Sequence, residues 1–339
     1  MEHAKPLTSQ MLDLIDGYWI SKMIHVIAEI NVADALREGP RSPADLACDL
    51  SLDADRLYRV LRALAGVGLF LEDAQGHFAL TPLGETLRTD RPDSMRAFAR
   101  MMPASYNWRA WDELASGVTS KTIPFETAFG KNTFEHLAEH SADETVVAEA
   151  MTSVSGAENP AVSAAIDLDN IETLVDLGGS AGHLLASVLA HHEGVRGVLF
   201  DQPQVVEVAK AAPFLSQPGI AERVTYEGGD FFTSVPAGLD GYMMKYILHD
   251  WNDDQCEQIL RNCREAMAPG GRVFVVDNVI HPGNDLSWGK LLDINMLVLT
   301  GGSERTEAQF AVLFERAGLR LDRVIPTACP LSIVVGVAL

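Results

Sequence analysis

The stretch Val175-Asp-Leu-Gly-Gly-Ser-Ala-Gly182 decides how this chain folds, because it joins an apolar strand to a glycine-rich turn that opens a helix. Asp201 ends the next predicted strand, 25 residues after Asp176. Glycines let the backbone approach a ligand where a Cβ atom would clash. A carboxylate at the end of the second strand is placed to bind both hydroxyl groups of a ribose. The unit therefore predicts a nucleoside site.

The spacing of the turn disfavours a dinucleotide. The fingerprint G-x-G-x-x-G needs glycines at its third and sixth positions, but counting from Gly178 these positions are Ser180 and His183. Asp176, in the mouth of the turn, would repel a pyrophosphate and attract an amino group or a sulfonium. The turn favours S-adenosylmethionine over NAD. Taken alone, it is equally typical of a tight connection between a strand and a helix.

Composition narrows the class of protein. The chain has 339 residues, of which 47% are hydrophobic, so two domains are expected. Its formal charge of −21 argues against nucleic acid and anionic lipid as partners. The sequence shows no signal-peptide pattern and no run of about 18 uncharged apolar residues, so we expect a soluble, cytoplasmic protein. We interpret all four cysteines as buried thiols, and neither as a disulfide framework nor as a zinc site: Cys48, Cys256, Cys263 and Cys329.

The N-terminal segment has the element order of a winged helix-turn-helix. Apolar residues recur at helical spacing over 7–36 and exceed what one small domain can cover. Ser42 and Pro43 are typical of a helix cap and a first helical residue. A second helix is predicted over 53–66. A β-hairpin follows, with strands over 70–72 and 77–80.

Such a module binds DNA or serves dimerisation. The candidate recognition helix carries three arginines, but Asp53 and Asp55 stand at its N-terminal end, where base contacts are usually made. The strongly negative chain also disfavours DNA. The apolar N-terminal helix needs a covering surface, and a second copy of the chain is the simplest one. We therefore expect a homodimer formed through the N-terminal domain, and no nucleic acid.

After residue 166 the pattern alternates between strand and helix. This alternation predicts an α/β fold with a doubly wound sheet. The last two strands are too close in sequence for a crossover helix, so they should pair antiparallel. The predicted strands cover residues 172–176, 197–201, 224–227, 241–247, 272–279, 319–325 and 332–337.

Polar side chains stand where these strands end. Ligands of open α/β sheets bind outside the carboxyl ends of the strands. Glu304 follows on the loop before the next predicted helix. The strand ends carry Asp176 with Gly178, then Asp201, Asp230, Lys245 with His249 and Asp250, and Asp277.

At this point the sequence resembles the caffeic acid and hydroxyindole type of S-adenosylmethionine-dependent O-methyltransferases, which includes bacterial small-molecule and polyketide enzymes. The resemblance covers nearly the whole chain and rests on six ordered motifs. They are 174–182, Phe200-Asp201-Gln-Pro-Gln-Val, Gly229-Asp230-Phe231-Phe232, Lys245-Tyr-Ile-Leu-His249-Asp250-Trp251, Ala268-Pro-Gly-Gly271 and Gly301-Gly-Ser-Glu304-Arg-Thr306.

The resemblance implies a class I methyltransferase, Rossmann-like fold behind a winged-helix dimerisation domain. The dimerisation domain would span 1–100 and the methyltransferase domain 101–339. Within the latter, 101–165 would form a helical linker and substrate-pocket segment, and 166–339 the Rossmann-like core. S-adenosylmethionine would be the cofactor, with no metal, and the acceptor a small aromatic or polyketide molecule.

The resemblance also implies roles for single residues. His249 would be the general base, steered by Asp277 and Glu304, although Asp277 replaces the commoner glutamate and reaches less far. The cofactor site would comprise Asp176, Gly178, Gly179, Asp201, Gln202, Asp230, Phe231, Lys245 and Asp250. Candidates for the substrate pocket are Trp108, Phe134, Met151, Asn295, Met296 and Leu299, although aromatic and Met residues at helical spacing are often ordinary core.

The chemistry of methyl transfer agrees with a histidine base. A phenol, with a pKa of about 10, keeps its proton at neutral pH, so a base must remove it before the oxygen attacks a sulfonium. A neutral imidazole accepts that proton, and a carboxylate partner stabilises the imidazolium. Four alternatives remain: transfer to nitrogen, a divergent relative with other chemistry such as hydroxylation, a metal-dependent catechol enzyme, and a winged-helix regulator that senses S-adenosylmethionine.

Overall fold

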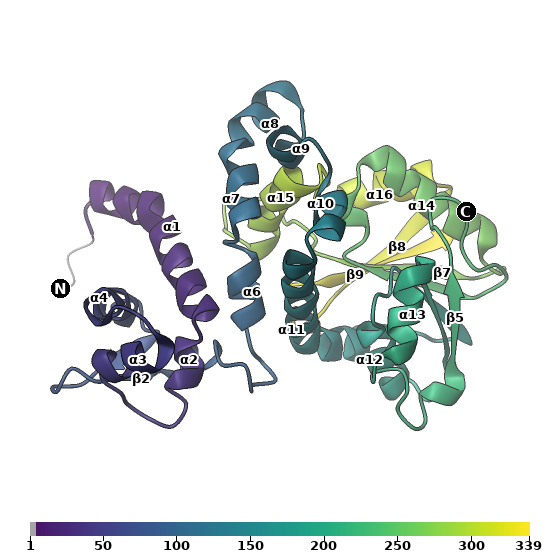
Figure 1. Cartoon of the computed structure of the whole chain (residues 1–339). Coiled ribbons are helices and arrows are strands. Elements are labelled where there is room, and N and C mark those ends of the chain that lie inside the picture. Colours follow the sequence, from purple (N-terminus) through teal and green to yellow (C-terminus); the bar gives the residue numbers. More distant parts are fainter. Residues whose placement is uncertain (1–4) are drawn as a thin grey trace. The chain divides into compact units, whose positions relative to one another are not determined.

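A computed structural model describes residues 5–339, which fall into two compact units (Figure 1). The first unit comprises Met1–Trp108 with Leu137–Val154, and the second comprises Arg109–His136 with Ser155–Leu339. The segment 101–165, which the sequence places in one domain, thus contributes to both units. The domain boundary at residue 100 stays a prediction.

The first unit contains the expected helices and hairpin. The Ser42 side chain caps α3 by accepting from the Asp45 amide, and Asp53 caps α4 in the same way. Strands β1 and β2 pair antiparallel. The elements are α1 (Leu7–Glu29), α2 (Val32–Ala35), α3 (Pro43–Leu50), α4 (Ala54–Ala65), β1 (Phe70–Glu72), β2 (Phe78–Leu80), α5 (Pro82–Glu85) and α6 (Arg96–Met101).

One continuous helix over 7–36 is not what the structure shows. The helix stops at Glu29, and Asn31 adopts a left-handed backbone conformation with φ of 58° before α2 begins. Asparagine tolerates this conformation better than most residues. Apolar spacing alone does not reveal such a break, because the periodicity of the side chains continues across it.

Some of the connecting helices contribute residues to both units, and the others lie wholly in the second unit. Helix α11 is the longest of these and continues through Pro160. Its last residues, from Ser155, belong to the second unit. The helices are α7 (Ser105–Asp112), α8 (Leu114–Ser120), α9 (Pro124–Phe129), α10 (Thr133–Glu139) and α11 (Ser141–Ala165).

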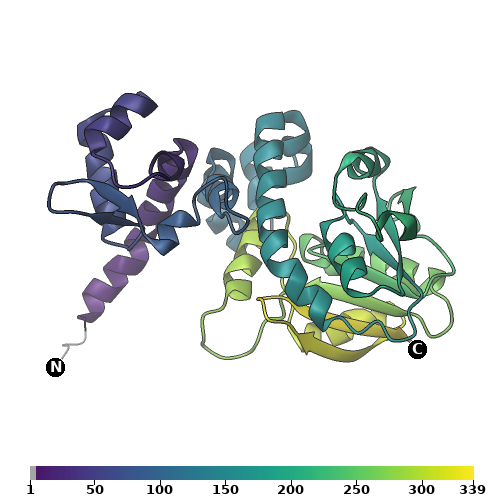
Figure 2. The same ribbon diagram turned by 90° about the horizontal axis from the view of Figure 1, so that it is seen from below.

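The second unit is built on a seven-stranded sheet in the order β5-β4-β3-β6-β7-β9-β8. All neighbours pair in parallel up to β7, and β9 pairs antiparallel with both β7 and β8, as predicted. Figure 2 shows this final hairpin in yellow. The strands are β3 (Thr173–Leu177), β4 (Arg196–Asp201), β5 (Val224–Gly228), β6 (Gly241–Lys245), β7 (Arg272–Asp277), β8 (Leu319–Pro326) and β9 (Ser332–Ala338).

Helices cover both faces of this sheet, which confirms the doubly wound arrangement. Alternate strand residues point to opposite sides, so Leu174 packs with Leu185 of α12, whereas Val175 lies in the cluster that contains Leu260 of α14 and Phe314 of α16. The remaining elements are α12 (His183–His191), α13 (Pro203–Ala211), η1 (Ala221–Arg223), η2 (Leu248–Asp250), α14 (Asp253–Ala266), α15 (Trp288–Leu299) and α16 (Glu307–Arg316).

The interpretation of the cysteines was wrong for two of the four. All are free thiols, and Cys256 and Cys263 are buried, but Cys48 is exposed and Cys329 is half-buried. On α3 the buried residues are Leu46 and Ala47, so the next position turns away from the core. Within the described part of the chain, every helix is too short or too polar to span a lipid bilayer.

Candidate active site at the carboxyl ends of the strands

The glycine turn after β3 presents a buried carboxylate. Gly178 has a φ of 68°, and a Cβ atom there would lie 2.4 Å from Ile247 Cδ1, so only glycine fits without a shift. Asp176 is 2% exposed, and its Oδ2 has no hydrogen-bond partner among the described residues. Burial and the nearby charge of Asp201 raise the pKa of Asp176 to about 7. An unpartnered carboxylate oxygen at a cradle of this shape fits a ligand with a positively charged donor.

Asp201 joins the end of β4 to the same turn. Its Oδ2 accepts from the Ser180 amide at 2.9 Å, and its Oδ1 accepts from the Gln202 amide at 2.7 Å. Burial raises the pKa of Asp201, although these two hydrogen bonds act in the opposite direction. The backbone of the turn is tied to β4 as well, since the Gly178 amide donates to Phe200 O at 2.8 Å, and Gly179 follows in the turn. The carboxylate is therefore held in a fixed position beside the glycine turn.

The loop after β5 supplies a polar and an aromatic group. Asp230 Oδ1 accepts from the Phe232 amide at 2.9 Å, which shapes the loop. The ring of Phe231 lies 4.9 Å from the ring of Phe232 and 6.4 Å from that of Trp251. Phe231 also borders the glycine turn, because its Cε1 would be 3.8 Å from a Cβ atom on Gly178. This loop thus lies beside the turn.

The side chain of Lys245, at the end of β6, is buried and paired. Its Nζ lies 2.8 Å from Glu158 Oε2 and donates to Asn159 Oδ1 at 3.0 Å. Its charge acts on Asp176, where it opposes the rise in that pKa, and on His183, whose pKa it helps burial to lower. The ammonium group is therefore close enough to influence the glycine turn. Sequence reasoning did not find Glu158 or Asn159, because they lie on α11, far away in the chain.

His249 lies in η2, between β6 and α14, and is 7% exposed. Its Nδ1 donates to Glu304 Oε1 at 2.7 Å, and its Nε2 lies 3.7 Å from Asp250 Oδ1. Burial alone would lower the pKa of His249. The charge of Asp250 and the hydrogen bond to Glu304 outweigh burial and raise that pKa to about 9. The imidazole is thus a strong base with one nitrogen already committed to a carboxylate.

A tightly packed loop brings Glu304 to the histidine. A Cβ atom on Gly302 would lie 1.9 Å from His249 O, so the loop can approach η2 only because this residue has no side chain. The Glu304 amide donates to Asp293 Oδ1 of α15 at 2.9 Å. Buried Arg305 donates to Leu248 O at 2.9 Å and so ties the loop to η2. Glu304 is 3% exposed and is therefore not a surface carboxylate.

Asp277 contacts the histidine's neighbour. Its Oδ1 accepts from the Tyr246 amide at 3.0 Å, and the described residues show no hydrogen bond between Asp277 and His249. The charge of Asp277 still contributes to the raised pKa of His249. Burial in turn raises the pKa of Asp277 to about 7, against the opposing charge of His249. Asp250 does not cap α14, because Asn252 is the N-cap of that helix.

Four of the six residues expected in the substrate pocket belong to the second unit, and the pocket itself stays a prediction for all six. Asn295 and Met296 are buried, and Leu299 is half-buried, on α15, and the ring of Phe134 stacks on Trp251 at 5.7 Å. Trp111 donates from its indole to Asn295 Oδ1 at 3.2 Å. The other two, Trp108 and Met151, belong to the first unit.

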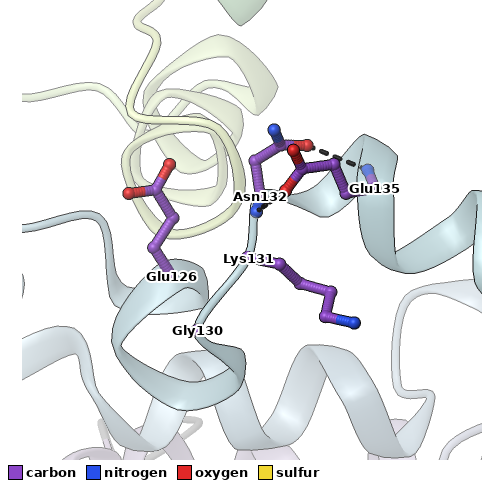
Figure 3. Close-up of a pocket in the computed structure, with 5 residues that line it drawn as sticks. All are labelled: Glu126, Gly130, Lys131, Asn132 and Glu135. Atoms are coloured by element: carbon purple, nitrogen blue, oxygen red, sulfur yellow. Dashed lines mark hydrogen bonds between the residues drawn. The ribbon is translucent and has the colours of Figure 1, made fainter.

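A separate surface pocket of about 360 Å³ contains none of the predicted site residues. Five residues around the α9–α10 loop line it: Glu126, Gly130, Lys131, Asn132 and Glu135 (Figure 3). The Asn132 and Glu135 side chains each accept from the other residue's backbone amide. This reciprocal pair caps the start of α10. The polar atoms of these two residues thus have a structural explanation.

The carboxyl edge of the sheet therefore combines two half-sites. A glycine cradle with buried Asp176 and the anchored carboxylate of Asp201 fits a cationic nucleoside, and a buried His249–Glu304 pair fits proton transfer. Among residues 5–339 no group of three or more His, Cys, Asp and Glu side chains is arranged to hold a metal ion. The two half-sites, the glycine cradle and the His249–Glu304 pair, together define a class I methyltransferase that uses S-adenosylmethionine.

Comparison with known proteins places the chain in a particular family. The O-methyltransferase domain matches residues 111–320, and the O-methyltransferase dimerisation domain matches residues 12–90. The chain belongs to the O-methyltransferase family. The match also confirms that the winged-helix module of the first unit is a dimerisation domain.

Individual relatives share nearly the full length of the chain. The phenazine O-methyltransferase PhzM of Lysobacter antibioticus is 40% identical over 98% of this chain and 96% of its own. The crystal structure of CalO1, a methyltransferase of calicheamicin biosynthesis with S-adenosylhomocysteine bound, is 37% identical, with a TM-score of 0.88 over 99% of this chain and 100% of its own. An 8-amino-8-demethylriboflavin N,N-dimethyltransferase of Streptomyces davaonensis is 33% identical over 91% of this chain and 88% of its own.

Proposed function

We propose that the enzyme transfers a methyl group from S-adenosylmethionine to a hydroxyl group of a small aromatic or polyketide-type molecule in secondary metabolism, with His249 as the general base. The observation that supports this proposal most directly is the buried hydrogen bond of 2.7 Å between His249 Nδ1 and Glu304 Oε1. This bond fixes the ring and leaves Nε2 to accept the proton of the acceptor. Relatives named for phenazine methylation and calicheamicin biosynthesis support the acceptor class.

The residues of the glycine turn would hold the cofactor. S-adenosylmethionine supplies an electrophilic methyl group on a positively charged sulfur. Asp176, with Gly178 and Gly179, would bind its positively charged end, and Asp201 with Gln202 would bind the ribose. Asp230 and Phe231 would frame the adenine, and Lys245 and Asp250 would border the reacting end. The buried, unpartnered Oδ2 of Asp176 supports this placement.

His249 must lose its own proton before it acts. With a pKa of about 9 it is mainly protonated at neutral pH in the ligand-free chain. A cation in the neighbouring cofactor site disfavours the imidazolium and so lowers this pKa. The neutral ring then accepts the proton of the acceptor, and Glu304 stabilises the imidazolium that forms. General-base catalysis of this kind accelerates a reaction by about 10² to 10⁴.

Transfer to nitrogen is the second candidate, because one relative is named as an N,N-dimethyltransferase. An amine with a free lone pair needs no base to expose its nucleophile. The buried His249–Glu304 pair therefore favours oxygen.

A transfer assay separates the two candidates. We would follow labelled methyl transfer from S-adenosylmethionine to phenols, hydroxyquinones and aromatic amines, without added metal, in wild type and in His249→Ala. A loss of about 100-fold or more with hydroxyl acceptors, at unchanged cofactor affinity, is expected. The exposed His191 on α12 gives the matched control His191→Ala, which should behave as wild type. Transfer to an amine that is insensitive to His249→Ala would contradict the proposal.

A homodimer through the first unit completes the proposed function. Helix α1 exposes a row of large apolar side chains, with exposures of 56% for Met11, 77% for Leu14, 58% for Ile15 and 52% for Trp19. Exposed apolar surface of this extent is typical of an interface. The dimerisation-domain match over residues 12–90 covers Leu14, Ile15 and Trp19, and Met11 immediately precedes it.

A further inference from the structure

Glu158 of α11 connects the two half-sites of the second unit. It is 7% exposed, and each of its carboxylate oxygens contacts a different residue of the β6 end. Oε2 lies 2.8 Å from Lys245 Nζ, and Oε1 accepts from the Tyr246 hydroxyl at 2.8 Å. A buried carboxylate is stable only when it is paired or hydrogen-bonded. Here Oε2 is ion-paired and Oε1 accepts a hydrogen bond. The role proposed above uses neither Glu158 nor Tyr246.

The ion pair between Glu158 and Lys245 borders the proposed cofactor site. Lys245 is 8% exposed at its side chain, and the carboxylate of Glu158 is the charge that compensates it at ion-pair distance. Its remaining hydrogen-bond partners, Asn159 and Ser155, are neutral. The charge of Lys245 also acts on Asp176 in the glycine turn. Without Glu158 an uncompensated ammonium group would face a site that must accept a sulfonium cation.

The hydrogen bond between Glu158 and Tyr246 lies next to the proposed base, His249. Tyr246 adopts a left-handed backbone conformation with φ of 57°, which is unfavourable for a bulky residue. Two interactions hold it there: its amide donates to Asp277 Oδ1 at 3.0 Å, and its hydroxyl donates to Glu158. Its ring stacks on the His249 ring, with centroids 5.0 Å apart and planes inclined by 25°. Glu158 thereby reaches the histidine through one aromatic ring.

We propose that Glu158 is a positioning residue with two tasks: it neutralises Lys245, so that the site admits the sulfonium of S-adenosylmethionine, and it fixes Tyr246 against His249. The proposal rests on the proposed placement of the cofactor and of the base. The charge-balancing task makes a prediction that a purely structural role does not make. S-adenosylmethionine carries one positive charge more than S-adenosylhomocysteine, so removal of the Glu158 charge must weaken the first more than the second.

Calorimetric titration of the full-length enzyme with each of these two compounds tests the charge. Glu158→Gln keeps the shape and a carbonyl acceptor for the Tyr246 hydroxyl but removes the charge. The dissociation constant of S-adenosylmethionine should rise about tenfold more than that of S-adenosylhomocysteine. Glu158→Asp, which retains the charge, should keep the wild-type ratio of the two constants. No acceptor is present, so failure of the proposed methyl transfer would leave this measurement unaffected.

A rescue variant distinguishes charge from packing. In Glu158→Gln with Lys245→Met, the uncompensated ammonium group is gone, and the ratio of the two dissociation constants should return to within about threefold of wild type. Equal weakening of both compounds in Glu158→Gln, or no rescue in the double variant, would overturn the charge-balancing role. If Glu158→Gln does not fold, as judged by circular dichroism, the double variant and Glu158→Asp still decide the question through the same ratio.

Tyr246→Phe tests the second task. It keeps the ring stacked on His249 but removes the hydroxyl that Glu158 binds. The turnover number should fall several-fold, while the dissociation constants of both cofactor forms stay within about twofold of wild type. An unchanged turnover number would overturn the link from Glu158 to the base. A change of cofactor affinity without any change of turnover would overturn it as well.

Discussion

Replacement of the buried carboxylate of Asp176 should stabilise the ligand-free protein. Raising the pKa of this group from 3.8 to about 7 corresponds to about 4 kcal/mol against its charged form. Asparagine has no charge to bury, but its amide donor is left without a partner, which costs about 1–3 kcal/mol. At about pH 8.5 we therefore expect Asp176→Asn to unfold with a free energy higher than that of wild type by about 1–3 kcal/mol.

The pH dependence of this gain follows from the sign of the shift. The carboxyl group holds its proton more tightly in the folded chain, so wild type loses stability as the pH rises from about 4 through 7. Asp176→Asn lacks this loss. The penalty on the wild-type carboxylate is about 3 kcal/mol at about pH 6 and about 4 kcal/mol at about pH 8.5. The advantage of the variant should thus grow by about 1 kcal/mol between these two pH values.

Urea unfolding of both proteins without cofactor, at the two pH values, measures this advantage. Glu265→Gln on α14, an exposed position, controls for the loss of one negative charge from the chain. An advantage that does not change with pH, or a variant less stable than wild type at about pH 8.5, would refute the reasoning. The same variant should bind S-adenosylmethionine at least about tenfold more weakly, because a hydrogen bond to a charged group contributes about 1.5–3 kcal/mol.

Three further predictions concern the base, its loop and the dimer. Glu304 helps to raise the pKa of His249 to about 9, so the acid limb of kcat/KM for the cofactor should lie near pH 9 in wild type. In Glu304→Gln this limb should move to lower pH. A pH–rate profile with the same limbs in both proteins would contradict this. Gly302→Ala places a Cβ atom 1.9 Å from His249 O, so thermal unfolding should show a loss of about 1–3 kcal/mol and kcat should fall at least tenfold; wild-type activity would disprove the packing argument. Ile15→Glu on α1 should shift the mass in light scattering toward the monomer, whereas an unchanged dimer would place the interface elsewhere.

Much of the fold could be predicted from the sequence because its signals are local. Strand positions followed from short apolar runs, and the helix start at Ser42 followed from a cap residue whose side chain accepts from the Asp45 amide three positions later. The break at Asn31 escaped prediction, because a single left-handed residue leaves the apolar periodicity intact. The exposure of Cys48 escaped for a related reason, since residue type alone does not say which way a helix position turns.

The residues of the candidate site also fall into two groups, those that the sequence pattern reveals and those that only the fold reveals. The strand-end residues Asp176, Asp201 and His249 were found because the carboxyl ends of parallel strands meet at one edge of a sheet, whatever the loops do. Glu158 lies on a distant helix, and no sequence spacing connects it with Lys245. Its proposed role rests on the fold, which places both of its oxygens at 2.8 Å from their partners.

The sequence by itself thus determined the order of elements and the type of cofactor turn, and it supplied His249 as the proposed base. Tertiary structure decided which carboxylate acts on that base: Glu304 bonds His249 directly, whereas Asp277 bonds the Tyr246 amide and acts on the histidine through its charge. The reason is physical. Motifs show which chemical groups the chain carries, but a hydrogen bond forms only when its two atoms are placed to within a few tenths of an ångström. Close contacts between distant parts of the chain fix such positions, and one of them is the contact of Gly302 with His249 O, 53 residues apart in sequence.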